Sequence, residues 1–334
     1  MGFASASGRC WAAKFPRVPR YLVTGCAGFI GSTLTDALLA DGCEIVGVDG
    51  FTDYYDRSAK QAAVAGAGAN PSFTLLEHDL AAGPLPDGVL EGVDGIFHLA
   101  ARPGVRASWG AGFEAYVSDN ILATHAIADV AGGRGIRLVF ASSSSIYGDA
   151  LAYPTPEDTQ PSPISPYGVT KLACEHLLAA HARDFGLQHV ALRYFTVYGP
   201  RQRPDMAFSR LVAALADGSA FEIYGDGSQS RDFTFVADAV GATIAAMRDA
   251  PAGATYNVGG GSDAALRDVV ALVEELAGRS LNVRYGERAP GDVKRTLADT
   301  SRIRSELGWQ PQTDLRAGLA AQLDAAGALA SSGD

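Results

Sequence analysis

The sequence predicts an α/β protein built on a doubly wound parallel sheet, with a smaller lobe in its C-terminal part. Three observations support this fold class. Short apolar runs alternate with stretches of helical periodicity, a glycine-rich turn follows the first apolar run, and the alternation becomes less regular beyond residue 196. A chain of 334 residues that is 47% hydrophobic and 19% charged is large enough for two lobes of a compact globule.

The apolar runs give the elements of the sheet. Residues 21–24 form a short strand-like run, residues 29–40 carry apolar side chains at helical spacing, and residues 44–49 form a second strand-like run, which together make a βαβ unit. Because helical stretches separate the later strands as well, the strands should lie parallel with helices on both faces. These later elements are strands at 72–76, 95–99, 137–141 and 189–194 and helices near 113–133 and 165–186.

The region beyond residue 196 reads as the smaller lobe. Its expected elements are a helix near 204–217, strands around 221–224 and 254–258, helices near 238–249 and 264–277, and a terminal helix from about Leu315. The predicted boundaries are a flexible tail at 1–19, a sheet domain at 20–195, a lobe mainly within 196–325 that is partly interleaved with the sheet domain, and a flexible tail at 326–334.

Charge and cysteine content narrow the function classes. A net charge of −10 argues against nucleic acid or an anionic membrane as the main partner. The segment before residue 20 lacks a continuous apolar stretch, and no run approaches the length of a membrane span, so we expect a cytoplasmic protein. The four cysteines, Cys10, Cys26, Cys43 and Cys174, form no C-x-x-C pair, so we expect neither a metal site nor a disulfide framework.

Gly25, Gly28 and Gly31 follow a strand and open a helix, the context in which a glycine triplet predicts a dinucleotide site of the Rossmann type. Small residues let the backbone approach a pyrophosphate, and the helix N-terminus supplies N–H groups. Asp49 ends the second strand 18 residues after Gly31, where its carboxylate would accept from ribose hydroxyls and repel a 2′-phosphate. We therefore expect NAD; the competing interpretation of Asp49 is an ordinary residue at a strand end.

Tyr167 and Lys171 are spaced for hydride-transfer chemistry. If residues 165–182 are helical, the two side chains lie on one face, and the ammonium would lower the pKa of a phenol that ordinarily titrates near 10. That change brings a tyrosine base within reach of neutral pH. The competing interpretation is an amphipathic pair with a snorkelling lysine. Only four of the 27 Lys+Arg residues are lysines, which favours a specific role for Lys171.

Together, these motifs resemble the extended short-chain dehydrogenase/reductase family, and within it the nucleotide-sugar epimerase branch. The resemblance covers roughly residues 20–325. It rests on Val-Thr-Gly-Cys-Ala-Gly-Phe-Ile-Gly-Ser (23–32), Val-Asp-Gly-Phe-Thr-Asp-Tyr-Tyr-Asp (48–56), His-Leu-Ala-Ala (98–101), the serine run 142–145, Ser-Pro-Tyr-Gly-Val-Thr-Lys (165–171), the segment 193–207 and Arg-Asp-Phe-Thr-Phe-Val-Ala-Asp (231–238). Residues 20–195 would then form an NAD-binding Rossmann domain.

The resemblance implies roles for individual residues. It makes Tyr167 the catalytic base, Lys171 a ligand of the nicotinamide ribose and Ser143 the hydroxyl partner of the reacting sugar oxygen. The expected cofactor-binding residues are Gly25, Gly28, Phe29, Ile30, Gly31, Asp49, Asp79, Leu80, Leu99, Ala100, Ala101, Asn120, Tyr167, Lys171 and Tyr194. The expected substrate-binding residues are Arg106, Ser142, Ser143, Ser144, Tyr167, Thr196, Arg203, Arg231 and Asp292, and no residue is expected to bind a metal.

Differences within the branch indicate the reaction. Related 4,6-dehydratases and uronate decarboxylases carry acidic residues where this chain has Ser144-Ser145. Epimerases of neutral hexoses usually carry Asn at the place of Thr196, whereas Thr196 and the segment 200–205 resemble epimerases of UDP-glucuronate. Arg203 would bind the sugar carboxylate, and Arg106 is a second candidate for anion binding. The competing interpretation of each arginine is a surface side chain in a turn.

The expected function is NAD-dependent 4-epimerisation of UDP-glucuronate to UDP-galacturonate through a transient 4-keto intermediate, without decarboxylation. Two alternatives remain open: 4-epimerisation of a neutral UDP-hexose or its N-acetyl analogue, and a non-catalytic NAD-binding sensor. Non-catalytic NAD-binding sensors usually lose the catalytic tyrosine or lysine, and this chain keeps both, as Tyr167 and Lys171. We expect a homodimer that works on a UDP-sugar, with no nucleic-acid or membrane partner.

Overall fold

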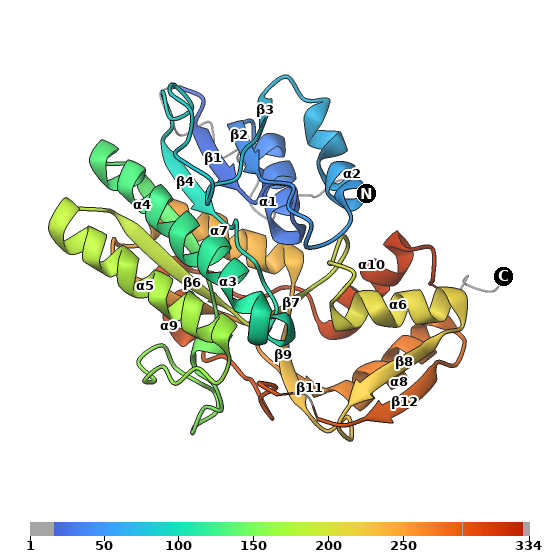
Figure 1. Ribbon diagram of the computed structural model, residues 1–334. Helices are drawn as coiled ribbons and strands as arrows, with labels where there is room; N and C mark the ends of the chain where they lie inside the picture. Colours follow the sequence, from blue (N-terminus) through green and yellow to red (C-terminus); the bar gives the residue numbers. More distant parts are fainter. Residues whose placement is uncertain (1–16, 289, 330–334) are drawn as a thin grey trace.

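The computed structural model describes residues 17–288 and 290–329, which are organised around a seven-stranded parallel sheet (Figure 1). The strand order is β10-β6-β5-β4-β1-β2-β3, so the chain starts at β1, builds outward to β3, and returns to build the other half from β4. This order confirms the predicted doubly wound Rossmann-type sheet. The strands are β1 (Arg20–Thr24), β2 (Glu44–Asp49), β3 (Phe73–Glu77), β4 (Gly95–His98), β5 (Arg137–Ser143), β6 (His189–Tyr194) and β10 (Thr255–Val258).

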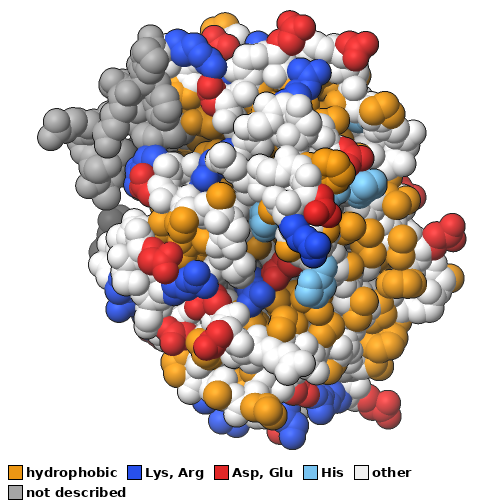
Figure 2. Space-filling model, turned by 90° about the vertical axis from the view of Figure 1, so that its left-hand side faces the viewer, with side chains coloured by type: hydrophobic (Ala, Val, Ile, Leu, Met, Phe, Trp, Pro, Cys, Tyr) orange, Lys and Arg blue, Asp and Glu red, His pale blue; other side chains and the backbone are white. Residues whose placement is uncertain are grey.

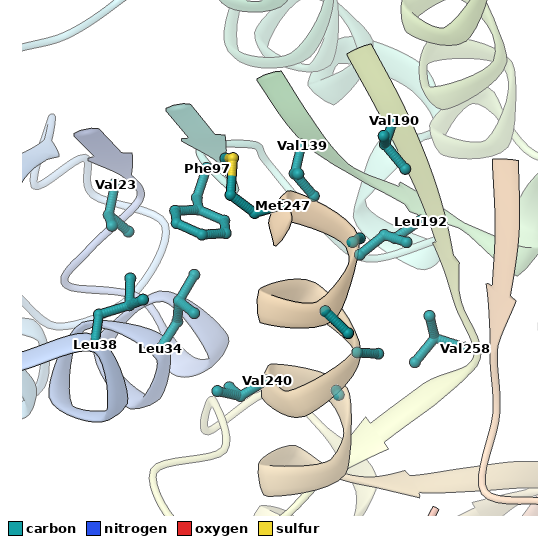
Figure 3. Close-up of a cluster of buried hydrophobic side chains, with 14 of the residues drawn as sticks. Val23, Leu34, Leu38, Phe97, Val139, Val190, Leu192, Val240, Met247 and Val258 are labelled. Atoms are coloured by element: carbon teal, nitrogen blue, oxygen red, sulfur yellow. The ribbon is translucent and has the colours of Figure 1, made fainter. Parts of the chain in front are cut away.

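Helices cover both faces of the sheet. On one face α1 (Phe29–Ala40) packs against α7 (Val236–Asp249), and Figure 3 shows their side chains meeting those of the strands, with Leu34 and Val240 on the helices and Phe97 and Val139 on the sheet. On the other face α4 (Ala123–Arg134) lies beside α5 (Pro166–Phe185), and these two helices close a second apolar cluster. Both faces of the sheet are therefore buried at its centre, as parallel sheets require, whereas the edge strand β3 is largely exposed.

Helix starts depend on local chemistry as well as on apolar spacing. The oxygen of Ser165 accepts from the backbone N–H of Gly168 at 3.1 Å, and Pro166 occupies the first turn, so α5 begins where the sequence places it. The predicted helix near 113–133 is instead three consecutive segments: α3 (Phe113–Tyr116), a π-helical turn η4 (Val117–Leu122) and α4.

The smaller lobe has its own apolar core, and Figure 1 shows it below the sheet, away from β1 to β3. Its strands form a β7-β9-β11 sheet and a β8-β12 pair. The chain interleaves the two lobes, because α7 and β10 return to the large sheet. The elements of the lobe are β7 (Thr196–Tyr198), α6 (Ala207–Asp217), β8 (Ala220–Tyr224), β9 (Ser230–Phe235), β11 (Asp263–Ala265), α8 (Leu266–Ala277), β12 (Asn282–Gly286) and α10 (Leu315–Ala325).

The sequence prediction missed several elements. Two of them are α2 (Arg57–Gly68) and α9 (Ser301–Leu307); the strands β7, β9, β11 and β12 were also missed. The predicted tails fall largely outside the described residues, at 1–16 and 330–334. Where the structure does begin, Arg17 pairs with Asp94 at 2.6 Å. Within the described part of the chain, no helix combines the length and apolar character needed to cross a bilayer.

Candidate active site

A cavity of about 730 Å³ runs along the carboxyl ends of the large sheet and reaches residues of the smaller lobe; we call it the central cavity. Ligands bind at this edge in doubly wound folds. The cavity brings together most of the residues predicted to bind cofactor or substrate: Gly25, Gly28, Phe29, Ile30, Gly31, Asp49, Asp79, Leu80, Leu99, Ala100, Ala101, Arg106, Ser142, Ser143, Ser144, Tyr167, Lys171, Tyr194, Thr196, Arg203 and Asp292.

The glycine turn at one end of the cavity is shaped for close approach. Gly25 has φ +70°, and a Cβ there would lie 2.8 Å from the backbone nitrogen of Ala100. A Cβ on Gly31 would overlap the carbonyl oxygen of Gly25. Gly28 caps α1 but has no side chain to accept from the first-turn N–H groups of the helix. These donors remain for a ligand in the cavity that Phe29 and Ile30 line. This cradle fits the pyrophosphate of a dinucleotide.

Asp49 has a structural role as well as a place in the cavity wall. Its carboxylate accepts from the backbone N–H of Ala27 at 3.1 Å and of Phe51 at 2.8 Å, so it ties the glycine turn to the loop after β2. The ammonium of Lys60 lies 3.7 Å from the same carboxylate and donates to the carbonyl of Thr52. Sequence reasoning missed Lys60, which offsets part of the negative charge of Asp49 where the cavity would receive a ribose.

The backbone after β4 forms the floor of the cavity. The hydroxyl oxygen of Thr24 accepts from the N–H groups of Leu99 and Ala100, at 3.2 and 3.1 Å. His98 fixes this hydroxyl through a 2.7 Å contact between Nδ1 and Oγ1, and burial lowers the pKa of His98 to about 3. The imidazole is therefore neutral and positions the floor.

Helix α5 presents Tyr167 and Lys171 to the middle of the cavity, one turn apart. Lys171 is 3% exposed, and its ammonium donates to the carbonyl of Ala141 at 2.8 Å and lies 4.8 Å from the centroid of the Phe140 ring. Burial lowers the pKa of Lys171 to about 8. The structure thus places both side chains at one site, as predicted.

The pKa of Tyr167 differs from the prediction. Burial raises it, and the two groups that most strongly oppose this rise are the Ser143 hydroxyl, through a hydrogen bond, and the positive charge of Arg203. Lys171 is not among the main causes of this pKa; its ammonium donates to the Ala141 carbonyl and lies over the Phe140 ring. In this structure, Ser143 and Arg203 stabilise the phenolate.

The serine run at the end of β5 divides into different roles. The Ser142 hydroxyl donates to the Glu175 carboxylate at 2.5 Å, and Glu175 pairs with Arg193 at 2.8 Å, so Ser142 belongs to a polar network beneath the cavity. Ser142 was expected to bind substrate; with its proton donated to Glu175, its hydroxyl oxygen can act toward a ligand only as an acceptor. Ser143 faces Tyr167 and accepts from the Ser145 N–H at 3.1 Å.

Arg203 lies at the same part of the cavity as Tyr167 and is 15% exposed. Two hydrogen bonds, from Nε and from Nη2, join it to the two carboxylate oxygens of Asp205, each at 3.0 Å. The Tyr54 hydroxyl donates to Asp205 at 3.4 Å. Tyr54 and Asp205 were not predicted, although both lie inside motifs that the sequence singles out. Arg203 is thus an anchored cavity residue, which argues against the surface interpretation.

Arg106 and Asp292 close the other end of the cavity. The guanidinium of Arg106 donates to the carboxylate of Asp292 at 2.8 Å and stacks 4.0 Å from the centroid of the Tyr224 ring, so this group joins the two lobes. Arg231 lies in an adjacent pocket of about 150 Å³, which Asp292 also lines. The structure therefore places Arg231 beside the central cavity, outside its wall.

Asn120, predicted to bind cofactor, does not line the central cavity. Its side chain is buried, accepts from the Arg102 N–H at 2.7 Å and donates to the Arg102 carbonyl at 3.1 Å and to the Thr170 hydroxyl at 3.0 Å. The amide therefore fixes the loop that follows β4 against α5.

Residues 21–259 match the profile of the NAD dependent epimerase/dehydratase family. The chain belongs to this family. It is 42% identical over 303 residues to the uncharacterized UDP-glucose epimerase YtcB of Bacillus subtilis, covering 90% of this chain and 95% of the relative. It is 35% identical over 309 residues to the UDP-glucuronate 4-epimerase of Thermodesulfobacterium geofontis, covering 90% of this chain and 93% of the relative.

A solved structure gives the same result for the fold. The UDP-glucuronic acid 4-epimerase of Bacillus cereus, in complex with UDP-glucuronic acid and NAD, superposes with a TM-score of 0.88 at 38% identity, covering 92% of this chain and 99% of that one. NAD is the cofactor of the family, and the glycine cradle, the Asp49 carboxylate and the buried Lys171 fit its pyrophosphate and ribose groups.

Several cavity residues of this family member were missed by sequence reasoning. Lys60, Arg102, Tyr54, Asp205, Arg210 and Tyr224 all line the central cavity. Tyr54 and Asp205 could have been noticed, because they stand within the quoted motifs. Arg210 and Tyr224 gave no such signal, since they lie in the lobe where the sequence pattern is least regular.

Proposed function

We propose that this protein is an NAD-dependent 4-epimerase that interconverts UDP-glucuronate and UDP-galacturonate through a transient 4-keto sugar, without decarboxylation. The observation that carries this proposal is the position of Arg203. Its anchored guanidinium lies in the central cavity near enough to Tyr167 for its charge to act on that phenol. A carboxylate on the sugar would meet this cation beside the catalytic base.

The chain's own groups account for the proton transfer. Tyr167 accepts the proton of the C4 hydroxyl. Its hydrogen bond to Ser143 orients the phenol, and the Ser143 hydroxyl can then bond to the sugar oxygen when substrate is bound. Bound NAD supplies the hydride chemistry at C4. The buried ammonium of Lys171 stands one helical turn from the base and provides donors for the ribose of the cofactor.

Arg203 also accounts for retention of the carboxylate. A 4-keto uronate is a β-keto acid, and it loses CO₂ when the breaking bond aligns with the carbonyl π system. A guanidinium whose orientation is fixed by Asp205 would hold the carboxylate away from that alignment and stabilise its charge. The adjacent Ser144 and Ser145 carry no carboxyl group that would assist elimination or decarboxylation.

Inversion at C4 requires a firm grip on the nucleotide and a loose grip on the sugar, because the keto intermediate must present its other face. We assign the grip on the nucleotide diphosphate to Arg106 and Arg231, which flank Asp292 at the far end of the cavity. Charge-assisted hydrogen bonds from these two guanidinium groups to the diphosphate would supply the firm grip.

The direct test is incubation of the purified protein with UDP-glucuronate, followed by NMR of the sugar signals. We expect UDP-galacturonate to appear until an equilibrium mixture forms, with no net accumulation of NADH, because the hydride is returned in each cycle. Stoichiometric NADH release would indicate a dehydrogenase, and a pentose product would indicate a decarboxylase.

A second candidate is 4-epimerisation of a neutral UDP-hexose, favoured by the 42% identity to a protein named as a UDP-glucose epimerase. UDP-glucose is therefore included in the same assay. Faster turnover of UDP-glucose than of UDP-glucuronate would favour this candidate.

We further propose that the protein is a homodimer that pairs through the α4–α5 face. Figure 2 views the molecule from this side, and hydrophobic side chains form a broad area on it. Leu122, Val169 and Phe185 contribute large exposed side chains, 51%, 47% and 67% exposed. A cytoplasmic location is proposed as well, supported by Cys26 and Cys174, which are buried cysteines outside any disulfide. Sedimentation velocity tests the assembly.

A further inference from the structure

Three potential metal ligands meet on the outer surface of α4 and α5, apart from the central cavity. They are His125 and Asp129 on α4 and His181 on α5. His181 lies ten residues beyond Lys171, which is about 15 Å along the helix axis. None of the three lines the central cavity, and the proposed reaction uses none of them.

The three side chains form a closed triangle of contacts, in which each imidazole uses one ring nitrogen toward each of its two partners. His125 Nδ1 lies 3.3 Å from His181 Nε2, His125 Nε2 lies 3.5 Å from Asp129 Oδ2, and His181 Nδ1 lies 3.6 Å from Asp129 Oδ1. Two ligands bound tetrahedrally at 2.0–2.1 Å from a zinc ion are about 3.3 Å apart. One donor atom from each residue lies within 4.8 Å of the others, so small rotations of the rings suffice to converge on one ion.

The helices hold this triangle in place. His125 and Asp129 are four residues apart, so they lie on one face of α4, and α4 packs along α5. The His181 side chain is 8% exposed and its ring lies 5.5 Å from that of Phe185, which limits its motion. In the single chain His125 and Asp129 are 51% and 56% exposed, so an ion reaches them from solvent before a second copy covers this face.

We propose that His125, Asp129 and His181 bind one divalent transition-metal ion of the zinc class. Two imidazoles and one carboxylate match the ligands that zinc, cobalt and nickel prefer, whereas calcium and magnesium prefer oxygen ligands alone. Since the ligands come from two helices, the ion ties α4 to α5 and stabilises the folded state over the unfolded chain.

The experiment uses the full-length protein without a polyhistidine tag, treated with a chelator and titrated with Co²⁺ and Zn²⁺ at pH 7.5. We expect one Co²⁺ per chain with visible d–d absorption, displacement by one Zn²⁺, and a rise in Tm on adding Zn²⁺. His125→Ala and His181→Ala should each weaken binding by at least the roughly 10- to 100-fold that loss of a mere supporting partner of a ligand causes. His176→Ala is the matched control, because His176 is an exposed histidine of α5 outside the triangle, and it should bind as wild type does.

The triangle lies in the face that we propose to meet a second copy, so each variant is also examined by sedimentation velocity. If loss of an imidazole alters assembly, Asp129→Asn tests metal binding instead, because it removes the carboxylate while nearly preserving the side-chain shape. A variant of His125, His181 or Asp129 that assembles as the wild type does but no longer binds the metal supports the site. Binding retained in the His125, His181 and Asp129 variants, binding lost in His176→Ala, or no Zn²⁺ binding by wild type below about 100 μM overturns it.

Discussion

Arg203 and Asp205 form a two-bonded ion pair in the central cavity, with Nε to Oδ1 and Nη2 to Oδ2 both 3.0 Å. A guanidinium carries five N–H donors in a planar fork. The hydrogen bonds found among the described residues occupy one edge of that fork and fix its plane, while its other edge carries further donors. The pair therefore prepares Arg203 to receive a second carboxylate in a set orientation, which is the geometry that a uronate requires.

The first prediction concerns Arg203→Ala. Removing one partner of a hydrogen-bonded charge pair costs about 2 to 5 kcal/mol, so kcat/KM on UDP-glucuronate should fall roughly 30-fold or more. UDP-glucose has no carboxylate and should lose less. The products that remain should contain a larger fraction of decarboxylated 4-keto-pentose, because the carboxylate is no longer held. The measurement is product analysis of both proteins on both substrates.

Arg201→Ala is the control for this prediction. Arg201 stands in the same loop but pairs with Asp36 at 2.7 Å and does not line the central cavity. It should leave the ratio of the two substrates unchanged. Equal losses of UDP-glucuronate and UDP-glucose turnover in Arg203→Ala would mean that Arg203 does not recognise the carboxylate, and the neutral-sugar candidate would then lead.

The second prediction concerns Tyr167→Phe. The change removes the hydroxyl that accepts the C4 proton while keeping the ring, which packs edge-on against Tyr116 with centroids 6.2 Å apart. Turnover should fall by about 10²- to 10⁴-fold with little change in Tm. Tyr285→Phe, at an exposed tyrosine of β12, should keep wild-type turnover. Near wild-type activity of Tyr167→Phe would refute its role as the base.

The third prediction follows from the pKa of Lys171, which burial lowers from 10.5 to about 8. Between these two values the unfolded chain binds a proton that the folded state has lost, so this residue makes stability rise with pH from about 8 to 10. Lys171→Met should remove that rise and gain stability at pH 7, where the wild type buries a charge. The free energy of unfolding of both proteins, measured by urea titration at pH 7.0, 8.5 and 9.5, checks this. Parallel pH profiles would contradict it.

Local motifs explain the part of the site that sequence alone predicted. The glycine turn and the Tyr167–Lys171 pair are each contained within one strand-helix unit or one helix, so spacing along the chain determines their position. Arg106 and Asp292 are 186 residues apart and meet only because the smaller lobe folds back on the large sheet. No periodicity in the sequence encodes such a contact.

Departures from the sequence expectations have physical causes of the same kind. Asn120 was expected at the cofactor because the resemblance implies that role; in the structure its buried amide bonds the backbone of Arg102, and it does not line the central cavity. Helix α2 was missed because its alanines and glycines give little apolar contrast; its start depends on Asp56, which accepts from the Ser58 N–H at 2.7 Å. The fold class needs only the order of apolar runs, so it was predicted correctly.

The fourth prediction concerns cofactor choice and depends on Asp49 and Lys60. The Asp49 carboxylate lines the cavity and disfavours a 2′-phosphate, while the Lys60 ammonium, 3.7 Å away, offsets part of that charge. Asp49→Asn removes the negative charge but keeps an acceptor for one of the two backbone N–H groups, so the protein should fold and the NAD-over-NADP preference should shrink by roughly 10-fold. Lys60→Met leaves the Asp49 carboxylate uncompensated and should widen the preference for NAD.

Asp87→Asn is the control: it lies at an exposed loop position outside the cavity and should leave the preference unchanged. The measurement is the dissociation constant of each dinucleotide, determined by calorimetry on cofactor-stripped protein. If Asp49→Asn showed the same preference as wild type, backbone shape rather than the Asp49 charge would select the cofactor.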